Sequence, residues 1–379
     1  MLGGPLLVSP FVGPDCSVPI ANWDGMTQSR LVFAFEKPGA YTNFGSRLLD
    51  DEVSQPCAVT VTVPARLHLG FLDLNGELGR RFGGIGLAIG DLGTRLTIER
   101  AATNDVSGPD ADRVWQHLQK IERLLSLRGG HRARVSEVVP AHAGLGSGTQ
   151  LALAVASGLR RLHNLPLDVA GDALRLGRGA RSGIGIGLFS RGGLVVDGGR
   201  GNEARLAPII CRLPVPENWR ILVILDPLRQ GIHGPEEGAT MAALPAMCAA
   251  DAARLCRLVL MQALPALADH DLANFGAAIK ELQIGLGDYF APAQSGARFM
   301  SPGVASILDI LDSAGAFGVG QSSWGPTGFA FAPTPDEAAR LAMIAAPQAR
   351  SRGLDIRICQ ALNRGAQIVA HAYTTESDN

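Results

Sequence analysis

The most constraining feature of this chain is a glycine-rich segment at residues 140–150, PAHAGLGSGTQ, which separates a predicted strand from a predicted apolar helix. Its glycines let the backbone curl and come close to a ligand. The following helix turns its free N–H groups and the positive end of its dipole toward the loop. This arrangement favours phosphate or pyrophosphate, although a glycine-rich turn without a ligand is the alternative. The candidate ligand-binding residues are His142, Gly144, Gly146, Ser147, Gly148, Thr149 and Gln150, with Ser147 also a candidate metal ligand.

The segment does not match either of the two common nucleotide-binding patterns. A Walker loop would need a Lys after its last glycine, and none follows Gly148. The GxGxxG spacing of dinucleotide-binding folds is also absent. The loop therefore predicts an anion site of another class.

A second glycine cluster, at residues 177–193, holds three arginines, Arg178, Arg181 and Arg191, among seven glycines. Packing explains such arginines poorly, whereas a planar guanidinium binds phosphate or carboxylate with two hydrogen bonds. The cluster therefore predicts contact with an anionic substrate, to which Ser182 also contributes. The alternative is a set of solvated loop arginines.

Two further segments are predicted to complete the pocket. On an extended strand through residues 64–76, Arg66 and His68 share one face. With Arg181 and Asp73 they are the candidate catalytic residues, and Asp73 is also a candidate metal ligand; a structural role is the alternative for His68. The Gly/Ser-rich loop predicted at residues 318–327 forms another wall through Gln321, Ser322, Ser323 and Trp324.

Composition narrows the class of protein. A chain of 379 residues has room for two domains with a real core. Its net charge of -1 argues against a nucleic-acid or membrane-surface binder. No apolar run reaches the roughly 18 residues that span a membrane. Six cysteines without zinc spacing predict reduced thiols of a cytoplasmic protein.

The chain alternates strands and helices, which predicts an α/β or α+β class. Residues 1–56 lack periodicity and are predicted to be a poorly ordered extension without signal-peptide features. The Pro-bearing segment 207–218 is the predicted domain boundary, and the last six residues are a predicted tail. Predicted strands are 58–64, 95–99, 132–139, 194–197, 220–226, 328–332 and 354–359; predicted helices are 111–128, 151–163, 168–177, 240–264, 269–284, 302–314 and 335–346.

The order of these segments resembles the GHMP kinase superfamily, which includes galactokinase, homoserine kinase and mevalonate kinase. Its three motifs correspond to residues 64–70, 140–150 and 318–328, and the resemblance covers about residues 58–375. It implies a ribosomal-S5-like domain at residues 57–210, followed by a ferredoxin-like domain at residues 211–379.

The chain departs from these kinases at the catalytic base. Kinases of this group commonly carry Ser-Gly-x-Asp, with the Asp as base, where this chain has Ser182-Gly183-Ile184-Gly185. A glycine cannot take a proton from a substrate hydroxyl. Arg66 also replaces the usual Lys and is not an equivalent proton-transfer group. The phosphate cradle is thus retained, while the base for phosphoryl transfer is lost.

One family combines these properties. The stretches FLDLNGELGRRFGGIGLAI, AHAGLGSGTQLALA, LGRGARSGIGIGLFSRGG and GQSSWGPTGFAF are similar to β-ribofuranosylaminobenzene 5′-phosphate synthases. The resemblance implies a pentosyltransferase of tetrahydromethanopterin biosynthesis. Such an enzyme condenses phosphoribosyl pyrophosphate with 4-aminobenzoate or 4-hydroxybenzoate and releases CO₂ and pyrophosphate. Mg²⁺ is the expected cofactor. Arg66 or Arg181 would hold the benzoate carboxylate, and His68 would polarise or deprotonate the para substituent.

Three questions stay open at the level of sequence. The alternative functions are an ATP-dependent small-molecule kinase on the same fold and a non-catalytic sensor of a phosphorylated metabolite. The choice between the two benzoates is undecided, because amino and hydroxyl groups need similar partners. The Ala/Leu-rich segment 240–284 suits a homodimer.

Overall fold

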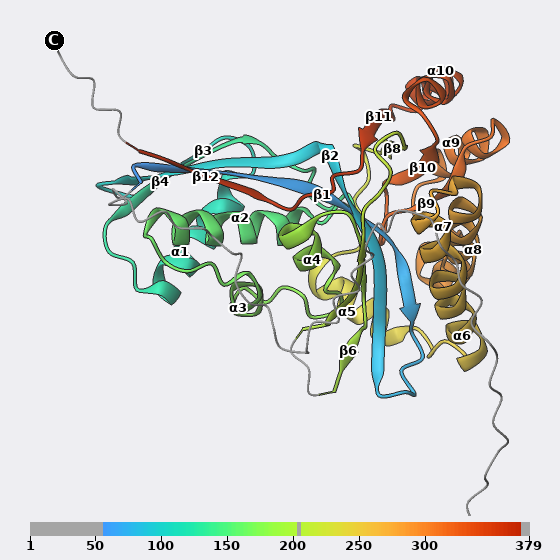
Figure 1. The fold of residues 1–379 in the computed structure, drawn as a ribbon, viewed down its shortest axis with the longest axis horizontal. Coiled ribbons are helices and arrows are strands. Elements are labelled where there is room, and N and C mark those ends of the chain that lie inside the picture. The colour runs from blue at the N-terminus through green and yellow to red at the C-terminus, as the bar shows by residue number, and fades with distance from the viewer. Residues whose placement is uncertain (1–55, 203–205, 373–379) are drawn as a thin grey trace, which may run out of the picture. The chain divides into compact units, whose positions relative to one another are not determined.

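The computed structural model describes residues 56–202 and 206–372 (Figure 1). The predicted extension, save for Pro56, and the predicted C-terminal tail lie outside these residues. The predicted mixed α/β class is confirmed. Strands and helices alternate along much of the chain, and the strands form two mainly antiparallel sheets.

The first sheet is built around one long hairpin of β1 (Ala58–Asp73) and β2 (Arg80–Ala101). Its strand order is β12-β1-β2-β4-β3, while β5 and β6 also pair with β2, and β7 pairs with β5. The remaining strands are β3 (Asp105–Ser107), β4 (Gly130–Glu137), β5 (Leu194–Asp197), β6 (Arg200–Gly201), β7 (Ile209–Leu213) and β12 (Gln367–His371). Because β12 pairs with β1, the chain returns to its first sheet at the end.

The hairpin corrects one prediction. The glycine-rich residues 83–93, expected to precede a short strand at 95–99, belong to β2 itself. A β-carbon at Gly86 would lie 2.5 Å from the carbonyl oxygen of Leu67 and 2.6 Å from Cγ2 of Ile184. The glycine therefore permits a helix to pack directly on the strand, where a side chain would prevent it.

Helices cover the first sheet, with α2 (Ser147–Leu162) buried on most sides as predicted. It begins at Ser147, four residues before the predicted start. Beside it lie α1 (Ala111–Leu125), α3 (Val169–Arg175) and α4 (Ile184–Arg191). The last of these is a second correction, because residues 177–193 were interpreted as a loop throughout.

The second sheet has the order β11-β8-β10-β9 and carries helices on both faces (Figure 1). Its strands are β8 (Arg220–Leu225), β9 (Phe317–Gln321), β10 (Gly328–Ala332) and β11 (Asp355–Gln360). α9 (Pro302–Ser313) and α10 (Pro335–Ser351) share one core with the sheet, while α8 (Leu272–Phe290) packs on its other face. The predicted loop 318–327 is thus a strand up to Gln321.

The predicted helix 240–264 is divided in the structure. α5 (Gly234–Ala243) ends before Pro245, which cannot donate a helical hydrogen bond. The chain then forms α6 (Ala249–Leu258), a π-helical turn (Val259–Ala263) and α7 (Leu264–Ala268). A short 3₁₀ turn (Ala291–Gln294) follows α8. Among the described residues no helix is long and apolar enough to cross a membrane. The homodimer stays a prediction.

Candidate active site

The three predicted motifs meet at one serine. The Ser322 hydroxyl accepts a hydrogen bond from the backbone N–H of His68 at 3.0 Å and donates one to the carbonyl oxygen of Gly144 at 2.7 Å. The N–H of Ser323 donates to the carbonyl oxygen of His68 at 3.1 Å. Strand β1, the glycine-rich segment at residues 140–150 (the phosphate loop) and the loop after β9 therefore form one site, as the order of motifs predicts.

The phosphate loop turns directly into α2. Gly146 is the N-cap of that helix in the left-handed conformation (φ 74°), and no side chain caps the helix. A β-carbon at Gly146 would lie 3.2 Å from Cβ and 3.4 Å from Nε of Arg66. The free N–H groups of the helix thus remain available to an anion, and one arginine lies beside them.

Arg66 lies along the inner side of this loop. Its Nη1 donates to the carbonyl oxygen of Gly144 at 3.3 Å, while its buried Nε has no hydrogen-bond partner in the described part of the chain. Burial lowers the pKa of Arg66 to about 10, against the opposing effects of Glu237 and Asp197. The group is therefore a buried cation at neutral pH.

Two more arginines converge on the first turn of α2. A β-carbon at Gly148 would lie 3.2 Å from Nη1 of Arg178 and 3.3 Å from Nη2 of Arg113. Arg113 pairs with Asp110 at 2.6 Å. Arg178, by contrast, makes no hydrogen bond or ion pair with any residue in 56–202 or 206–372, and its Nε is buried. Burial and the neighbouring Arg113 lower the pKa of Arg178. An anion bound beside both guanidinium groups would offset the repulsion between them.

His117 lies one helical turn after Arg113, beside the two arginines. It follows Arg113 by four residues on α1, so that both lie on the same helix face. Burial, reinforced by Arg178 and Arg113, lowers the pKa of His117 to about 4. Its imidazole is therefore neutral at pH 7 and presents one donor and one acceptor nitrogen.

This pKa predicts an acid-sensitive contribution to stability. The folded-state pKa of about 4 lies below the unfolded value of 6.5, so the contribution is complete above pH 6.5 and is lost as the pH falls toward 4. We expect a loss of up to about 3 kcal/mol in unfolding free energy from this group. In His117→Gln that component should disappear, so chemical denaturation between pH 7 and pH 4 should give a flatter profile.

The exposed His270 provides a matched control, because it lies in the turn before α8, away from the arginines. His270→Asn should retain the steep pH profile of the parent protein. Identical pH profiles for His117→Gln and the parent would contradict a buried neutral His117.

A second polar cluster surrounds the N-terminus of α4. The buried Asp197 carboxylate accepts hydrogen bonds from the Ser182 hydroxyl at 3.0 Å and from the N–H groups of Gly183 at 2.8 Å and Gly199 at 2.9 Å. Its pKa is raised by burial, against the opposing effect of these hydrogen bonds. The neighbouring Arg181 donates to Glu237 on α5. The charges of Asp197, Glu237 and Arg181 all act on Arg66, and the charge of Arg66 acts on His68. Three of the four candidate catalytic residues, Arg66, His68 and Arg181, therefore lie in one region.

The glycine in place of the kinase base is packed, not open. A β-carbon at Gly185 would lie 3.2 Å from Cγ2 of Thr149. Gln150 donates from Nε2 to the carbonyl oxygen of Gly185 at 2.9 Å, which joins α2 to α4. A side chain at this position would be in tight contact with Thr149, which would have to shift by a few tenths of an ångström.

Two predicted residues lie apart from this centre. Arg191 is at the opposite end of α4 from Ser182, near Arg212. Asp73 ends β1, roughly 15 Å along the strand from His68. Its Oδ1 accepts hydrogen bonds from the N–H groups of Asn75 and Gly76. Their roles in the site stay predictions.

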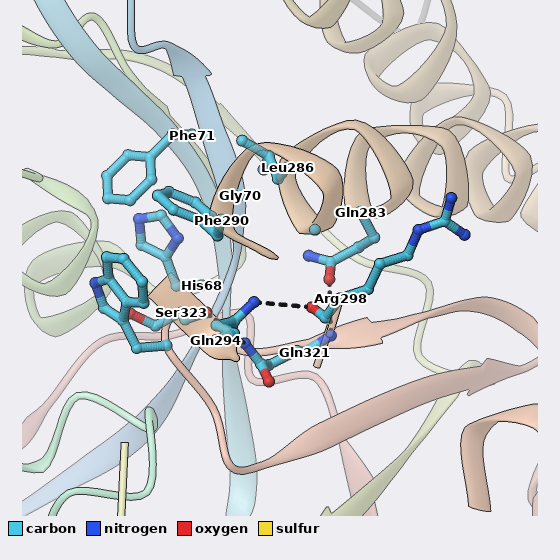
Figure 2. Close-up of a pocket in the computed structure, with 12 residues that line it drawn as sticks. His68, Gly70, Phe71, Gln283, Leu286, Phe290, Gln294, Arg298, Gln321 and Ser323 are labelled. Carbon is cyan, nitrogen blue, oxygen red and sulfur yellow. Dashed lines mark hydrogen bonds between the residues drawn. The ribbon is translucent and has the colours of Figure 1, made fainter. Parts of the chain in front are cut away.

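An aromatic pocket opens beside His68, between β1, α8 and the loop after β9 (Figure 2). Its lining residues are His68, Gly70, Phe71, Gln283, Leu286, Gly287, Phe290, Gln294, Arg298, Gln321, Ser323 and Trp324. Ring centroids lie 4.6 Å apart for His68 and Phe71, and 4.6 Å apart for Phe290 and Trp324. Four predicted residues, His68, Gln321, Ser323 and Trp324, therefore line this pocket, whereas Ser322, which links the motifs, does not.

Sequence reasoning missed several residues of the site. Arg113 and His117 fall within the helix predicted at residues 111–128 and are not among the predicted site residues, although their spacing of four residues places them on one helix face. Asp197 and Glu237 had no local motif. Phe71 and Phe290 come from β1 and the end of α8, and nothing in the local pattern links them.

Comparison with known proteins decides the family. Residues 111–192 match the GHMP kinases N terminal domain, and residues 263–344 match the GHMP kinases C terminal domain. The beta-ribofuranosylphenol 5′-phosphate synthase of Archaeoglobus fulgidus is 31% identical over 319 residues, covering 80% of this chain and 97% of the relative. The synthase of the same name from Methanocaldococcus jannaschii is 32% identical over 305 residues, covering 72% and 88%. The chain belongs to this synthase family. The resemblance drawn from the motifs is thereby confirmed.

Solved structures confirm the fold. The homoserine kinase of Cytophaga hutchinsonii superposes with a TM-score of 0.60 at 17% identity, covering 83% of this chain and 98% of the kinase. The mevalonate diphosphate decarboxylase of Staphylococcus aureus gives a TM-score of 0.57 at 12% identity, covering 82% and 98%. At these identities the likeness concerns the GHMP fold alone.

Proposed function

We propose that the chain condenses phosphoribosyl pyrophosphate with 4-hydroxybenzoate, releasing CO₂ and pyrophosphate and forming β-ribofuranosylphenol 5′-phosphate. The product names of the synthase relatives support the phenol over the aminobenzene. The observation that carries the proposal is the Arg113–Arg178 pair at the start of α2, because Arg178 has no anionic partner among the described residues. A pyrophosphate group would supply one.

The proposed reaction uses the site in three parts. Pyrophosphate leaves the anomeric carbon with the electrons of the broken C–O bond, stabilised by the α2 N-terminus and by Arg113 and Arg178. The anomeric carbon gains oxocarbenium character, as in glycosyl transfer. The ring carbon that bears the carboxylate then bonds to it. Cleavage of the bond to the carboxylate releases CO₂ and returns its electrons to the ring.

The neutral state of His68 limits its role. Burial and the nearby Arg66 hold the pKa of His68 well below 6.5. A base this weak does not keep a proton taken from a phenol, but it accepts a strong hydrogen bond from one. We therefore assign His68 to polarisation of the para-hydroxyl, the first of the two roles that the resemblance implies.

Mg²⁺ remains part of the proposal as an ion carried by the pyrophosphate. Within residues 56–202 and 206–372 no three His, Cys, Asp or Glu side chains gather to hold a metal. Mg²⁺ does not require such a group, because it is commonly held by one or two carboxylates together with substrate phosphates and water. The Ser147 hydroxyl begins α2 at the anion site and would be its protein ligand there. The bound ion would neutralise charge that develops on the leaving group.

The kinase alternative has less support. Gly185 offers no proton acceptor, and it packs closely against Thr149. Turnover separates the remaining functions: the protein is incubated with phosphoribosyl pyrophosphate, Mg²⁺ and each of the two benzoates, and CO₂ release is followed. Release with 4-hydroxybenzoate supports the synthase, whereas no release with either acid contradicts it. Sensing without turnover would leave binding of phosphoribosyl pyrophosphate but no CO₂.

A further inference from the structure

The aromatic pocket contains buried polar atoms that lack partners. His68 is 1% exposed, and within the described chain neither Nδ1 nor Nε2 of its ring has a hydrogen-bond partner. Trp324 is 3% exposed, and its Nε1 likewise has none among those residues. Buried donors and acceptors are paired in nearly all native structures. Both residues line the pocket and come from two different motifs, so a ligand that enters it can supply the missing partners.

The glutamine side chains on the opposite wall of the pocket already have hydrogen-bond partners within the protein. Gln321 donates from Nε2 to Oε1 of Gln294 at 3.0 Å, and its backbone N–H donates to Oε1 of Gln283 at 2.7 Å. Gln283 in turn donates to the carbonyl oxygen of Leu69. Figure 2 shows these glutamines facing His68 across the pocket. They form a fixed framework, so recognition falls to His68 and Trp324.

Among common ligand groups, a hydroxyl is the one that can pair with both His68 and Trp324. A neutral imidazole offers one nitrogen as an acceptor, whereas an indole N–H only donates. A hydroxyl group can donate to the first and accept from the second. An aromatic amine can donate, but its lone pair is delocalised into the ring and accepts poorly. A carboxylate accepts only, and its charge is costly to bury without a cation.

The walls of the pocket agree with a hydroxylated ring. Phe71 and Phe290 each pack against one of the two polar groups, and aromatic faces pack favourably on a planar ligand. The cavity has a volume of about 20 Å³, which is room for about one water molecule and therefore for one hydroxyl group. The ring itself enters only when the neighbouring side chains move.

We propose that this pocket is the acceptor subsite, in which Trp324 and His68 together recognise the para-hydroxyl of 4-hydroxybenzoate. The assignment rests on the proposed function. Arg66 precedes His68 by two residues on the same strand face, which separates them by about 7 Å along β1. A para-substituted benzoate has a similar length, so with its hydroxyl at His68 its carboxylate can reach Arg66, which lies beyond the residues that line the pocket. Its reacting carbon would then face the phosphate loop, where Arg66 lies.

Trp324→Phe tests the assignment, because it removes the indole N–H and keeps an aromatic ring. We expect kcat/KM for 4-hydroxybenzoate to fall by about 10- to 100-fold, since the hydroxyl oxygen loses its donor. For 4-aminobenzoate we expect a fall of less than about threefold, because its amine makes little use of that donor. The KM for phosphoribosyl pyrophosphate should not change.

Trp219→Phe is the matched control, since Trp219 is 2% exposed and packs on Phe275 in the core. It should leave the ratio of the two acids unchanged. Thermal unfolding of both variants separates a folding defect from a change in recognition. Equal losses for both acids in a folded Trp324→Phe, or no loss for either, would overturn the acceptor assignment while leaving the synthase function intact.

Binding measurements distinguish this failure from failure of the proposed function. Calorimetric titration of 4-hydroxybenzoate into the parent protein and Trp324→Phe is carried out in the presence of pyrophosphate. Binding that depends on Trp324, in a protein that releases no CO₂, would support the pocket and reject the synthase. Turnover together with acceptor binding that ignores Trp324 would support the synthase and reject the pocket. Neither turnover nor binding would reject both.

Discussion

Arg178→Ala should lower kcat/KM for phosphoribosyl pyrophosphate by about 100- to 1000-fold, which corresponds to about 3–4 kcal/mol of lost interaction with the anion. The guanidinium lies beside Arg113 at the first turn of α2 and makes no ion pair in the described parts of the chain. Its removal therefore breaks no internal contact of that kind. We expect the melting temperature to stay the same or to rise, because the substitution removes a half-buried cation without an ion-pair partner among the described residues.

Arg178→Lys refines this expectation. An ammonium group keeps the charge but loses the planar fork that donates two hydrogen bonds to a phosphate. An intermediate loss of about tenfold should follow. In calorimetric titration with pyrophosphate alone, affinity should decrease in the order parent protein, Arg178→Lys, Arg178→Ala. This order is expected because the arginine is assigned to the leaving group and not to the acceptor.

Arg175→Ala is the control for this series. Arg175 lies three residues earlier, on α3, and its Nη1 pairs with Asp168 at 2.7 Å and Asp172 at 2.9 Å. Its loss should affect stability slightly and leave kcat/KM unchanged. Full activity of Arg178→Ala, or an equal loss in Arg175→Ala, would contradict the anion site.

Arg178 and Arg113 differ in whether their place in the site can be predicted from the sequence. Arg178 could be predicted because it stands among glycines, where packing gives no reason for a guanidinium. Arg113 could not, because a polar residue on an amphipathic helix has the same local pattern whether it faces water or a ligand. Only the packing of α1 against α2 places its guanidinium at Gly148.

Glycine was the strongest predictor of the site and also the main source of error in the fold. Residues 140–150 form the predicted turn, because Gly144 and Gly146 need a positive φ. In α4, however, Gly185 has ordinary helical geometry and is small because α2 packs against it. A sequence alone does not separate a glycine needed for its backbone conformation from one needed for close packing. The helix within residues 177–193 was missed for this reason.

Gly144→Ala should have the second largest effect. Its φ of 74° is strained for any residue with a side chain. Its β-carbon would also lie 2.3 Å from the carbonyl oxygen of Ser322 and 2.8 Å from that of Gly325. Both contacts are with backbone, which cannot rotate away. We expect about 2–4 kcal/mol of lost stability and a melting temperature lower by about 5–10 °C.

Gly144→Ala should also lose activity at temperatures at which the variant is still folded. The Ser322 hydroxyl joins the carbonyl oxygen of Gly144 to the backbone of His68, so that a shift of the loop changes all three motifs together. Displacement of catalytic groups by about 1 Å can cost about 100-fold in rate. We therefore expect kcat/KM to fall by at least that factor when it is measured well below the melting temperature of the variant.

Gly353→Ala is the control that distinguishes backbone strain from steric clash as the cause of the effect in Gly144→Ala. Gly353 has a similar φ of 69°, and nothing lies within 4 Å of the β-carbon it would gain. This variant should show only the cost of the left-handed conformation, about 1–2 kcal/mol, with unchanged kcat/KM. The difference in melting temperature between the two variants then measures the contact of the phosphate loop with the loop after β9. Equal melting temperatures and full activity in Gly144→Ala would mean that the three motifs do not meet at Ser322, and the site would lose its common framework.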